Sequence, residues 1–277
     1  MQKYFIFSIL VCLLCACEKS DKKPLKPKYV VLTRVVHILP TEYSEGKEMK
    51  EIFAYNSFGY ENGYALYVNG EKVEERKNYQ HDEQGREIHW EFLGPTGEKG
   101  LTMDYTYSAS GKVVLEDKIF HSYTKNDYTV EEKHYIKEYT YDNQDREICV
   151  LSYLNGEVFS TYKNYKYDKD DNLLQWEDMD ENGKLQMKYE ASYDNKGKMI
   201  TNVVSSYMTF FDFVMRYEYS YDSSGKLISM KEYLDGKFVN EMKDYTYDEA
   251  ENVLSSKLCG IDGSVLTEYY YTYQKFE

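Results

Sequence analysis

From Tyr29 onward, apolar and polar residues alternate along the chain, which is the period of β-strands and not of helices. The alternation stops at short polar turns such as DEQG after His81, SASG after Tyr107 and DSSG after Tyr221. A second kind of turn, marked by a glycine as at Gly156, lies nine to eleven residues before the second residue of the next aromatic pair. Two turns per unit leave strands of about eight residues, a usual length in an antiparallel meander.

The stretch YSYDSSGKL, Tyr219 to Leu227, shows the repeating unit most clearly. We number each unit by its second aromatic position, Tyr221 in this example, and call that position the frame residue. The frame residues follow one another in steps of 26, 26, 34, 26, 26, 28, 26 and 26 residues. They are Tyr55, His81, Tyr107, Tyr141, Tyr167, Tyr193, Tyr221, Tyr247 and Tyr273. A nearly fixed period predicts one array of about eight to nine β-hairpin repeats over residues 29–277, without a second domain.

The loop length decides which residues share a face of the sheet. An aromatic residue stands two places before most frame residues, and an aliphatic residue such as Ile228 stands seven places after. A four-residue loop puts these two sets on one face, whereas a three-residue loop with a glycine bulge puts the sixth residue there instead. We favour the four-residue loop because Glu87 and Glu147 occupy the sixth position. The predicted fold is therefore all-β, an elongated and coiled antiparallel meander.

Two cysteines of the repeat domain test this expectation. Cys149 and Cys259 lie in units about eight strands apart, which is about 38 Å along a meander at roughly 4.8 Å per strand. A disulfide needs α-carbons within about 7 Å. Both thiols are predicted to stay free unless the sheet closes into a compact barrel.

The N-terminal residues carry an export signal. An apolar run from Tyr4 to Leu14 follows Lys3 and is short for a membrane span. The sequence Leu14, Cys15, Ala16, Cys17 resembles the lipobox of bacterial lipoproteins; an ordinary secretory signal is the alternative. The resemblance implies that residues 1–16 are removed, that Cys17 receives the lipid, and that residues 17–28 form a flexible tether. In some bacteria an aspartate directly after the lipidated cysteine retains a lipoprotein in the inner membrane. Glu18 stands at that position instead, so we expect this protein at the outer membrane.

Composition narrows the choice of partner. The chain has 277 residues, 32 of them tyrosine, and a formal net charge of −14. Tyrosine is a good strand former whose ring can be half-buried while its hydroxyl stays hydrated. A net negative charge repels phosphate backbones, so nucleic acid is not an expected partner.

Known catalytic motifs are missing from the sequence, which contains no GxSxG, HExxH, Walker or GxGxxG pattern. We expect no enzyme activity and no cofactor. Asp178, Asp180 and Asn182 match the first half of a calcium loop, but no glutamate stands at its closing position and the repeat requires a turn at Gly183. These three residues are interpreted as part of a turn, with metal binding as the weak alternative.

Three aromatic residues are candidates for ligand contact. Trp90 and Trp176 both stand nine residues after a frame residue, so they occupy equivalent places in two units. Exposed rings at these places could stack on sugars, although packing in the core is the simpler interpretation. Phe210 lies in the apolar stretch YMTFFDFVM, where a turn glycine is expected, and could belong to a contact patch.

The repeating units resemble a known family. YTYDNQDRE, YKYDKDDNL and YSYDSSGKL resemble the YD repeats of RHS-type bacterial proteins over about residues 50–277. The second turns, such as YVNGEKV, resemble MORN-variant repeats of some bacterial antitoxin-like proteins more weakly. The first resemblance implies tyrosine-rich β-hairpin repeats and no particular activity.

Our leading hypothesis is a lipid-anchored, non-enzymatic protein of the cell envelope that presents an extended β surface to a glycan or a protein. The alternative is a structural or inhibitory partner protein, in the manner of an antitoxin or immunity protein.

Overall fold

The protein is an antiparallel β-structure throughout the part of the chain that the computed structural model describes, which is residues 29–40, 45–57, 59–94, 96–125, 128–208 and 211–275. These residues form twenty strands and no helix. The strands are β1 (Tyr29–Ile38), β2 (Lys47–Tyr55), β3 (Glu61–Val68), β4 (Glu71–His81), β5 (Glu87–Leu93), β6 (Lys99–Tyr107), β7 (Val113–Phe120), β8 (Tyr123–Lys125), β9 (Tyr128–Val130), β10 (Lys133–Tyr141), β11 (Glu147–Leu154), β12 (Glu157–Tyr167), β13 (Leu173–Asp180), β14 (Leu185–Tyr193), β15 (Met199–Met208), β16 (Phe211–Tyr221), β17 (Leu227–Leu234), β18 (Lys237–Tyr247), β19 (Val253–Gly260) and β20 (Val265–Lys275).

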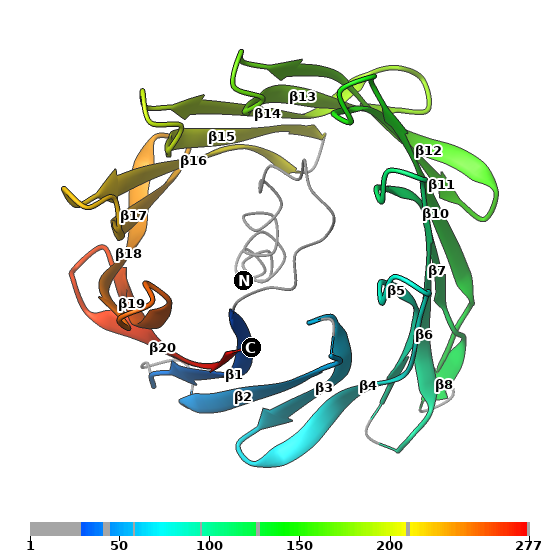
Figure 1. Ribbon diagram of the computed structural model, residues 1–277, viewed down its shortest axis with the longest axis horizontal. Coiled ribbons are helices and arrows are strands. Elements are labelled where there is room, and N and C mark those ends of the chain that lie inside the picture. Colours follow the sequence, from blue (N-terminus) through cyan, green and yellow to red (C-terminus); the bar gives the residue numbers. More distant parts are fainter. Residues whose placement is uncertain are drawn as a thin grey trace.

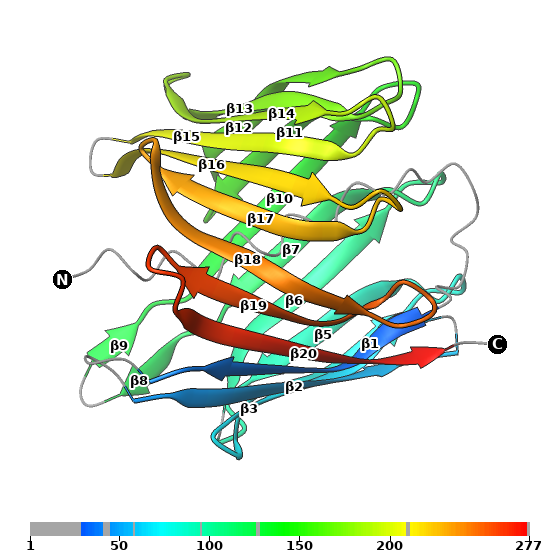
Figure 2. The ribbon, with the colours of Figure 1, turned by 90° about the vertical axis from the view of Figure 1, so that its left-hand side faces the viewer.

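The sheet closes on itself. Apart from β8 and β9, each strand pairs with its neighbours in sequence; β7 pairs with β10, and the first strand β1 pairs with both β2 and the last strand β20. The result is an 18-stranded antiparallel barrel, seen end-on in Figure 1 and from the side in Figure 2. Across the seam between β1 and β20, the hydroxyl oxygens of Thr33 and Thr272 are 2.6 Å apart.

The predicted elongated meander with free ends is therefore wrong, although its all-β, antiparallel content is confirmed. An open meander leaves unpaired N–H and C=O groups on its two end strands, and closure pairs them. Every hairpin whose first strand ends at a frame residue has a register shift, which marks a β-bulge. Bulges increase the bend and twist of a sheet. We attribute the closure to this curvature, added up around the ring.

The turn after each frame residue explains the aspartate of the repeat. Asp222 donates its N–H to the carbonyl of Lys226 (2.9 Å), and Gly225 donates to the carbonyl of Asp222 (3.0 Å). The side chain of Asp222 also accepts the N–H of Lys226 (2.8 Å). Gly225 has φ 90°, a left-handed conformation, so the loop has three residues and a bulge.

The predicted four-residue loop is therefore wrong. Tyr221 lies opposite Leu227, the sixth residue after the frame, and Tyr219 lies opposite Met230. The same left-handed conformation is kept where glycine is replaced, at Asp145, Asp171 and Glu251.

The frame residues close the junctions between hairpins. The strands β15 and β16 pair only from Thr201 and Glu218 onward, which leaves the carbonyl of Met199 without a ladder partner. The hydroxyl of Tyr221 donates to that carbonyl (2.9 Å). His81 does the same with its ring, because its Nε2 lies 3.1 Å from the carbonyl of Glu61. Equivalent hydroxyl contacts are made by Tyr55, Tyr107, Tyr141, Tyr167, Tyr193, Tyr247 and Tyr273. The repetition of tyrosine thus follows from the repetition of the junction.

The two faces of the barrel differ in burial. Residues directly opposite each other across a strand pair lie on the same face, so the pairs Tyr219–Met230, Met230–Met242 and Leu258–Thr267 trace one face around the ring. Tyr219 on this face is 9% exposed, whereas Tyr270 on the other face is 41% exposed. Side chains on the concave side of a closed sheet converge and cover one another. We call the more buried face the inner wall and the other face the outer wall.

The eight extra residues before Tyr141 form a separate element. The strands β8 and β9 pair only with each other, between β7 and β10, and take no part in the 18-stranded sheet. Figure 2 shows this hairpin projecting beyond one end of the barrel. The insertion therefore lengthens one connection without changing the ring.

Closure does not bring the two cysteines together. Cys149 on β11 and Cys259 on β19 are eight strands apart in a ring of 18. At roughly 4.8 Å per strand the ring is about 27 Å across, so these strands are nearly opposite. Both thiols are free in the structure. We predict that denatured, non-reduced protein starting at Lys19 labels two thiols per chain; a count of zero with one intramolecular bridge would contradict this arrangement.

Candidate functional site

The inner wall combines tyrosine hydroxyls with acceptor side chains. Tyr64 donates to Glu51 (3.1 Å), Tyr79 donates to Glu61 (2.6 Å), and Tyr165 donates to Glu147. Burial is the main cause that raises the pKa of these tyrosines, and the neighbouring carboxylates raise it further. The phenols therefore stay protonated and act as hydrogen-bond donors at neutral pH.

Arg76 on β4 is the centre of one inner-wall cluster. Its guanidinium lies between two rings, 4.4 Å from the centroid of Tyr64 and 4.7 Å from that of Trp90. One guanidinium nitrogen lies 3.4 Å from the carboxylate of Glu61. A guanidinium stacked on two rings is held flat, and this fixes the directions of its N–H donors.

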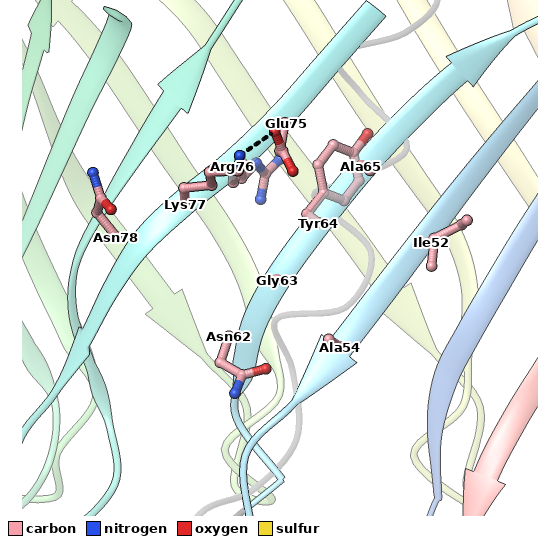
Figure 3. Close-up of a pocket in the computed structure, with 10 residues that line it drawn as sticks. All are labelled: Ile52, Ala54, Asn62, Gly63, Tyr64, Ala65, Glu75, Arg76, Lys77 and Asn78. Atoms are coloured by element: carbon pink, nitrogen blue, oxygen red, sulfur yellow. Dashed lines mark ion pairs between the residues drawn. The ribbon is translucent and has the colours of Figure 1, made fainter. Parts of the chain in front are cut away.

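A pocket of about 420 Å³ opens beside Arg76, at the junction of β3 and β4. Figure 3 shows Tyr64 and Arg76 on neighbouring strands, with the ion pair of Glu75 and Lys77 beside them. The two strands pair only as far as Tyr64 and Arg76, because β4 continues into a bulge at Asn78, which has φ 57°. The pocket is thus lined by residues of both walls, at a place where the backbone ladder between two hairpins is interrupted.

Glu87 is the inner-wall group of this cluster with the most unusual acidity. Burial, and then the nearby Glu61, raise the pKa of Glu87 to about 7, while Arg76 and a hydrogen bond from Trp90 oppose the increase. The carboxyl is therefore partly protonated near neutral pH and can donate as well as accept.

The raised pKa gives a prediction about stability. A carboxyl whose pKa is higher in the folded than in the unfolded state stabilises the fold at low pH, and this contribution is lost as pH rises through about 7. Glu87→Gln removes the titration and keeps the shape. We expect the variant to melt at a higher temperature than the parent at pH 8 and to lose this advantage at pH 5. Equal differences at both pH values would contradict the raised pKa.

The two tryptophans lie at equivalent places on the inner wall. Trp90 is 8% exposed and packs against Arg76, while Trp176 stacks on Tyr189 with ring centroids 5.6 Å apart. Their strands, β5 and β13, are six apart in the ring, or about 23 Å across a barrel of about 27 Å. Ligand binding by either ring stays a prediction. Trp176 is the more accessible of the two, since it is only half-buried.

The structure separates the three residues of the possible calcium loop. Asp178 is buried on the inner wall opposite Tyr162, with one carboxylate oxygen that has no hydrogen-bond partner. Asp180 caps the next turn, where its side chain accepts the N–H groups of Asn182 (3.0 Å) and Lys184 (2.9 Å). Within the residues described, no group of three or more His, Cys, Asp or Glu side chains could hold a metal ion.

Two predicted site residues, Cys17 and Phe210, lie outside the described residues, so lipidation of Cys17 and ligand contact by Phe210 stay predictions. The signal and tether, residues 1–28, lie outside them as well. In the described part of the chain, no helix is long and apolar enough to cross a membrane.

Arg76, Glu61 and Glu87 were not among the site residues predicted from the sequence. One signal was available, because Glu87 and Glu147 interrupt a position that is aliphatic in most other units. A second signal is the tripeptide Lys-Asn-Tyr, which marks the bulges at Asn78 and Asn164.

The fold defines this protein as a closed, up-and-down antiparallel β-barrel. No protein-family profile and no curated protein matches the chain. Among solved structures, it is similar to a porin-like protein from Bacteroides uniformis ATCC 8492, with 12% identity, a TM-score of 0.45, and coverage of 91% of this chain and 100% of that one. A porin-like protein from Bacteroides vulgatus ATCC 8482 matches with 10% identity, a TM-score of 0.41, and coverage of 88% and 98%.

A third similarity is partial. The Photorhabdus luminescens Tc holotoxin pore matches with 11% identity and a TM-score of 0.28, over 83% of this chain but 16% of that one. The resemblance to YD repeats is wrong as an identification, because the hairpins build a closed 18-stranded barrel. The residues that resemble YD repeats form the turn and the junction of a single hairpin. They do not determine how the hairpins assemble.

Proposed function

We propose that this protein is a non-enzymatic, lipid-anchored binding protein of the cell envelope, located at the outer membrane, and that its inner wall binds a glycan. The proposal rests on one observation, the gathering of aromatic rings and carboxylates on the same wall. Trp176 with Tyr162 and Asp178, and Tyr64 with Glu51, are two such groups. We therefore place the ligand on the inner wall of the barrel and not on the extended β surface that the sequence predicts.

Glycan chemistry fits this wall. The C–H faces of sugars are apolar and pack on aromatic rings, whereas their hydroxyls need acceptors and donors. The inner wall offers both kinds of group beside the rings, from carboxylates such as Glu61 and Glu147 and from phenols such as Tyr162. Burial raises the pKa of Tyr162 to about 12, so its hydroxyl remains a donor. The carboxylates disfavour polyanionic ligands.

A glycan array with protein starting at Lys19 tests the proposal. We expect retention of at least one glycan class by the parent protein, and loss of at least tenfold in affinity in Trp176→Ala. Tyr270→Ala, which removes an exposed ring from the outer wall, is the matched control and should bind as the parent does. Both variants should first be shown to melt cooperatively.

Three outcomes would contradict glycan binding on the inner wall. These are retention of no glycan by the parent, equal losses in the two variants, and unchanged affinity in Trp176→Ala. Co-purification of one protein in a 1:1 ratio, with no glycan retained, would favour the structural or inhibitory partner instead.

A further inference from the structure

The outer wall carries charged side chains at the middle of its strands. Lys188 and Glu190 form an ion pair (2.7 Å) at the centre of β14, and Arg216 and Glu218 form another on β16. Further around the ring, Lys257 on β19 pairs with Glu268 on β20 (3.5 Å).

These charges continue from strand to strand as a belt. Glu218 lies opposite Lys231, and Lys231 lies opposite Glu241. On the far side of the seam, the Lys77–Glu75 pair on β4 (2.8 Å) occupies the same wall. Opposite charges on neighbouring strands suit contact with water, because exposed ions keep their hydration.

A barrel that spans a bilayer needs the opposite pattern. Its lipid-facing side chains form an apolar band about 25 Å tall, and each lysine or arginine at mid-depth is strongly unfavourable. Lys77, Lys188, Arg216, Lys231 and Lys257 would all stand inside that band. Their summed penalty at mid-depth is comparable with the whole stability of a typical domain.

Exchanging the roles of the two walls does not remove the conflict. The inner wall carries Arg34, Arg76, Lys118 and Lys137 as well as several buried carboxylates, Glu51 and Glu232 among them. Neither wall therefore offers lipid a continuous apolar surface.

The exposed aliphatic residues do not supply a band either. Ile148, Ile200, Ile228 and Leu254 are exposed, but each is the seventh residue after its frame residue, beside the turn. These four make a single row beside the turns that follow the frame residues. The other exposed aliphatic residues are spread over β1, β12, β16 and the turn after β19; they are Leu32, Val158, Val214 and Ile261. Charged residues stand at the strand centres between them.

We infer that the barrel stands in water with its outer wall fully hydrated, and that it meets the membrane only through a lipid on Cys17. The interior of the barrel is then not a passage across the bilayer. This inference uses the charges of the walls and is independent of the ligand proposed for the inner wall.

Vesicle flotation with full-length protein and its Cys17→Ala variant tests the inference. Both proteins are mixed with phosphatidylcholine vesicles and centrifuged through a density gradient. We expect lipidated protein to float and at least nine-tenths of Cys17→Ala to stay in the aqueous fraction. Cys17→Ala should also be monodisperse and melt cooperatively in buffer without detergent.

Other results would overturn the inference. The Cys17→Ala protein is made without residues 1–16, so that no apolar signal remains on it. Its flotation after a carbonate wash would show that the barrel itself inserts. A Cys17→Ala protein that aggregates in buffer but folds in detergent would show the same, and so would stepwise conductance across a planar bilayer. Failure of glycan binding leaves each of these readouts unchanged, so the two proposals fail separately.

Discussion

Replacing Tyr219 with alanine is expected to lower the free energy of unfolding by about 4 kcal/mol, because a buried aromatic side chain leaves a cavity and loses its transfer energy. Tyr219 is 9% exposed, lies opposite Met230, and donates its hydroxyl to Asn202 (3.0 Å). Urea denaturation of the Cys17→Ala protein, with and without the substitution, measures the difference.

Two control variants separate burial from hydrogen bonding. Tyr219→Phe keeps the ring and removes the hydroxyl, so we expect a loss of about 1 kcal/mol. Tyr270→Ala removes a ring from the outer wall, where the side chain is 41% exposed, and should cost less than about 0.5 kcal/mol. Equal losses in Tyr219→Ala and Tyr270→Ala would contradict the assignment of inner and outer walls.

The second large effect is expected at the ion pair next to the seam. Arg34 on β1 donates two hydrogen bonds to Glu51 on β2, and Glu51 is 8% exposed. Among the residues that the structure describes, Arg34→Leu leaves this buried carboxylate with the Tyr64 hydroxyl as its donor, which should cost about 3 kcal/mol. The same denaturation experiment measures it.

The double variant Arg34→Leu/Glu51→Leu is the matched control. Replacing both partners of a buried ion pair with apolar residues is often nearly neutral, so we expect it to recover most of the loss. A double variant as unstable as the single one would mean that the leucines do not pack, and a single variant as stable as the parent would mean that the pair is hydrated.

The local structure of the repeat could be predicted from the sequence because it is made of short-range contacts. The aspartate of each unit caps the turn that directly follows it, as Asp222 does for Lys226. The period of the tyrosines follows from a contact that spans about one unit, such as Tyr167 to the carbonyl of Glu147. The capped turn and the tyrosine contact both form between residues about one repeat apart or closer, so the residue spacing in the sequence is enough to predict them.

The loop length was predicted wrongly because we expected the face that carries the tyrosines to be apolar. Glu87 and Glu147 seemed unsuited to that face, and this favoured the longer loop. In the structure both glutamates stand on the inner wall, where Glu147 accepts a hydrogen bond from Tyr165 and Glu87 accepts one from Trp90. The interior of a small barrel is filled with packed apolar side chains, but a barrel of 18 strands is wide enough to hold polar groups inside. The expectation of an apolar inner face therefore does not apply to it.

Closure could not be predicted because it depends on residues far apart in the chain. Thr33 and Thr272 meet across the seam although 239 residues separate them. The sequences of β1 and β20 do not indicate whether these two strands pair with each other or remain as open edges of the sheet. The Arg76 cluster escaped prediction for a related reason, since Glu61, Arg76 and Trp90 come from three different strands.

The most direct test of the closed barrel is a cross-link at its seam. Thr33→Cys/Thr272→Cys, made in a chain that starts at Lys19 and lacks Cys149 and Cys259, places two thiols at directly opposite positions of β1 and β20. The account predicts an intramolecular disulfide under mild oxidation, detected as a faster-migrating band and by peptide mapping. The control pair Thr33→Cys/Thr201→Cys joins β1 to β15, about 23 Å away across a ring of about 27 Å, and should stay reduced. An open chain would leave both pairs reduced, and that result would contradict the closed barrel.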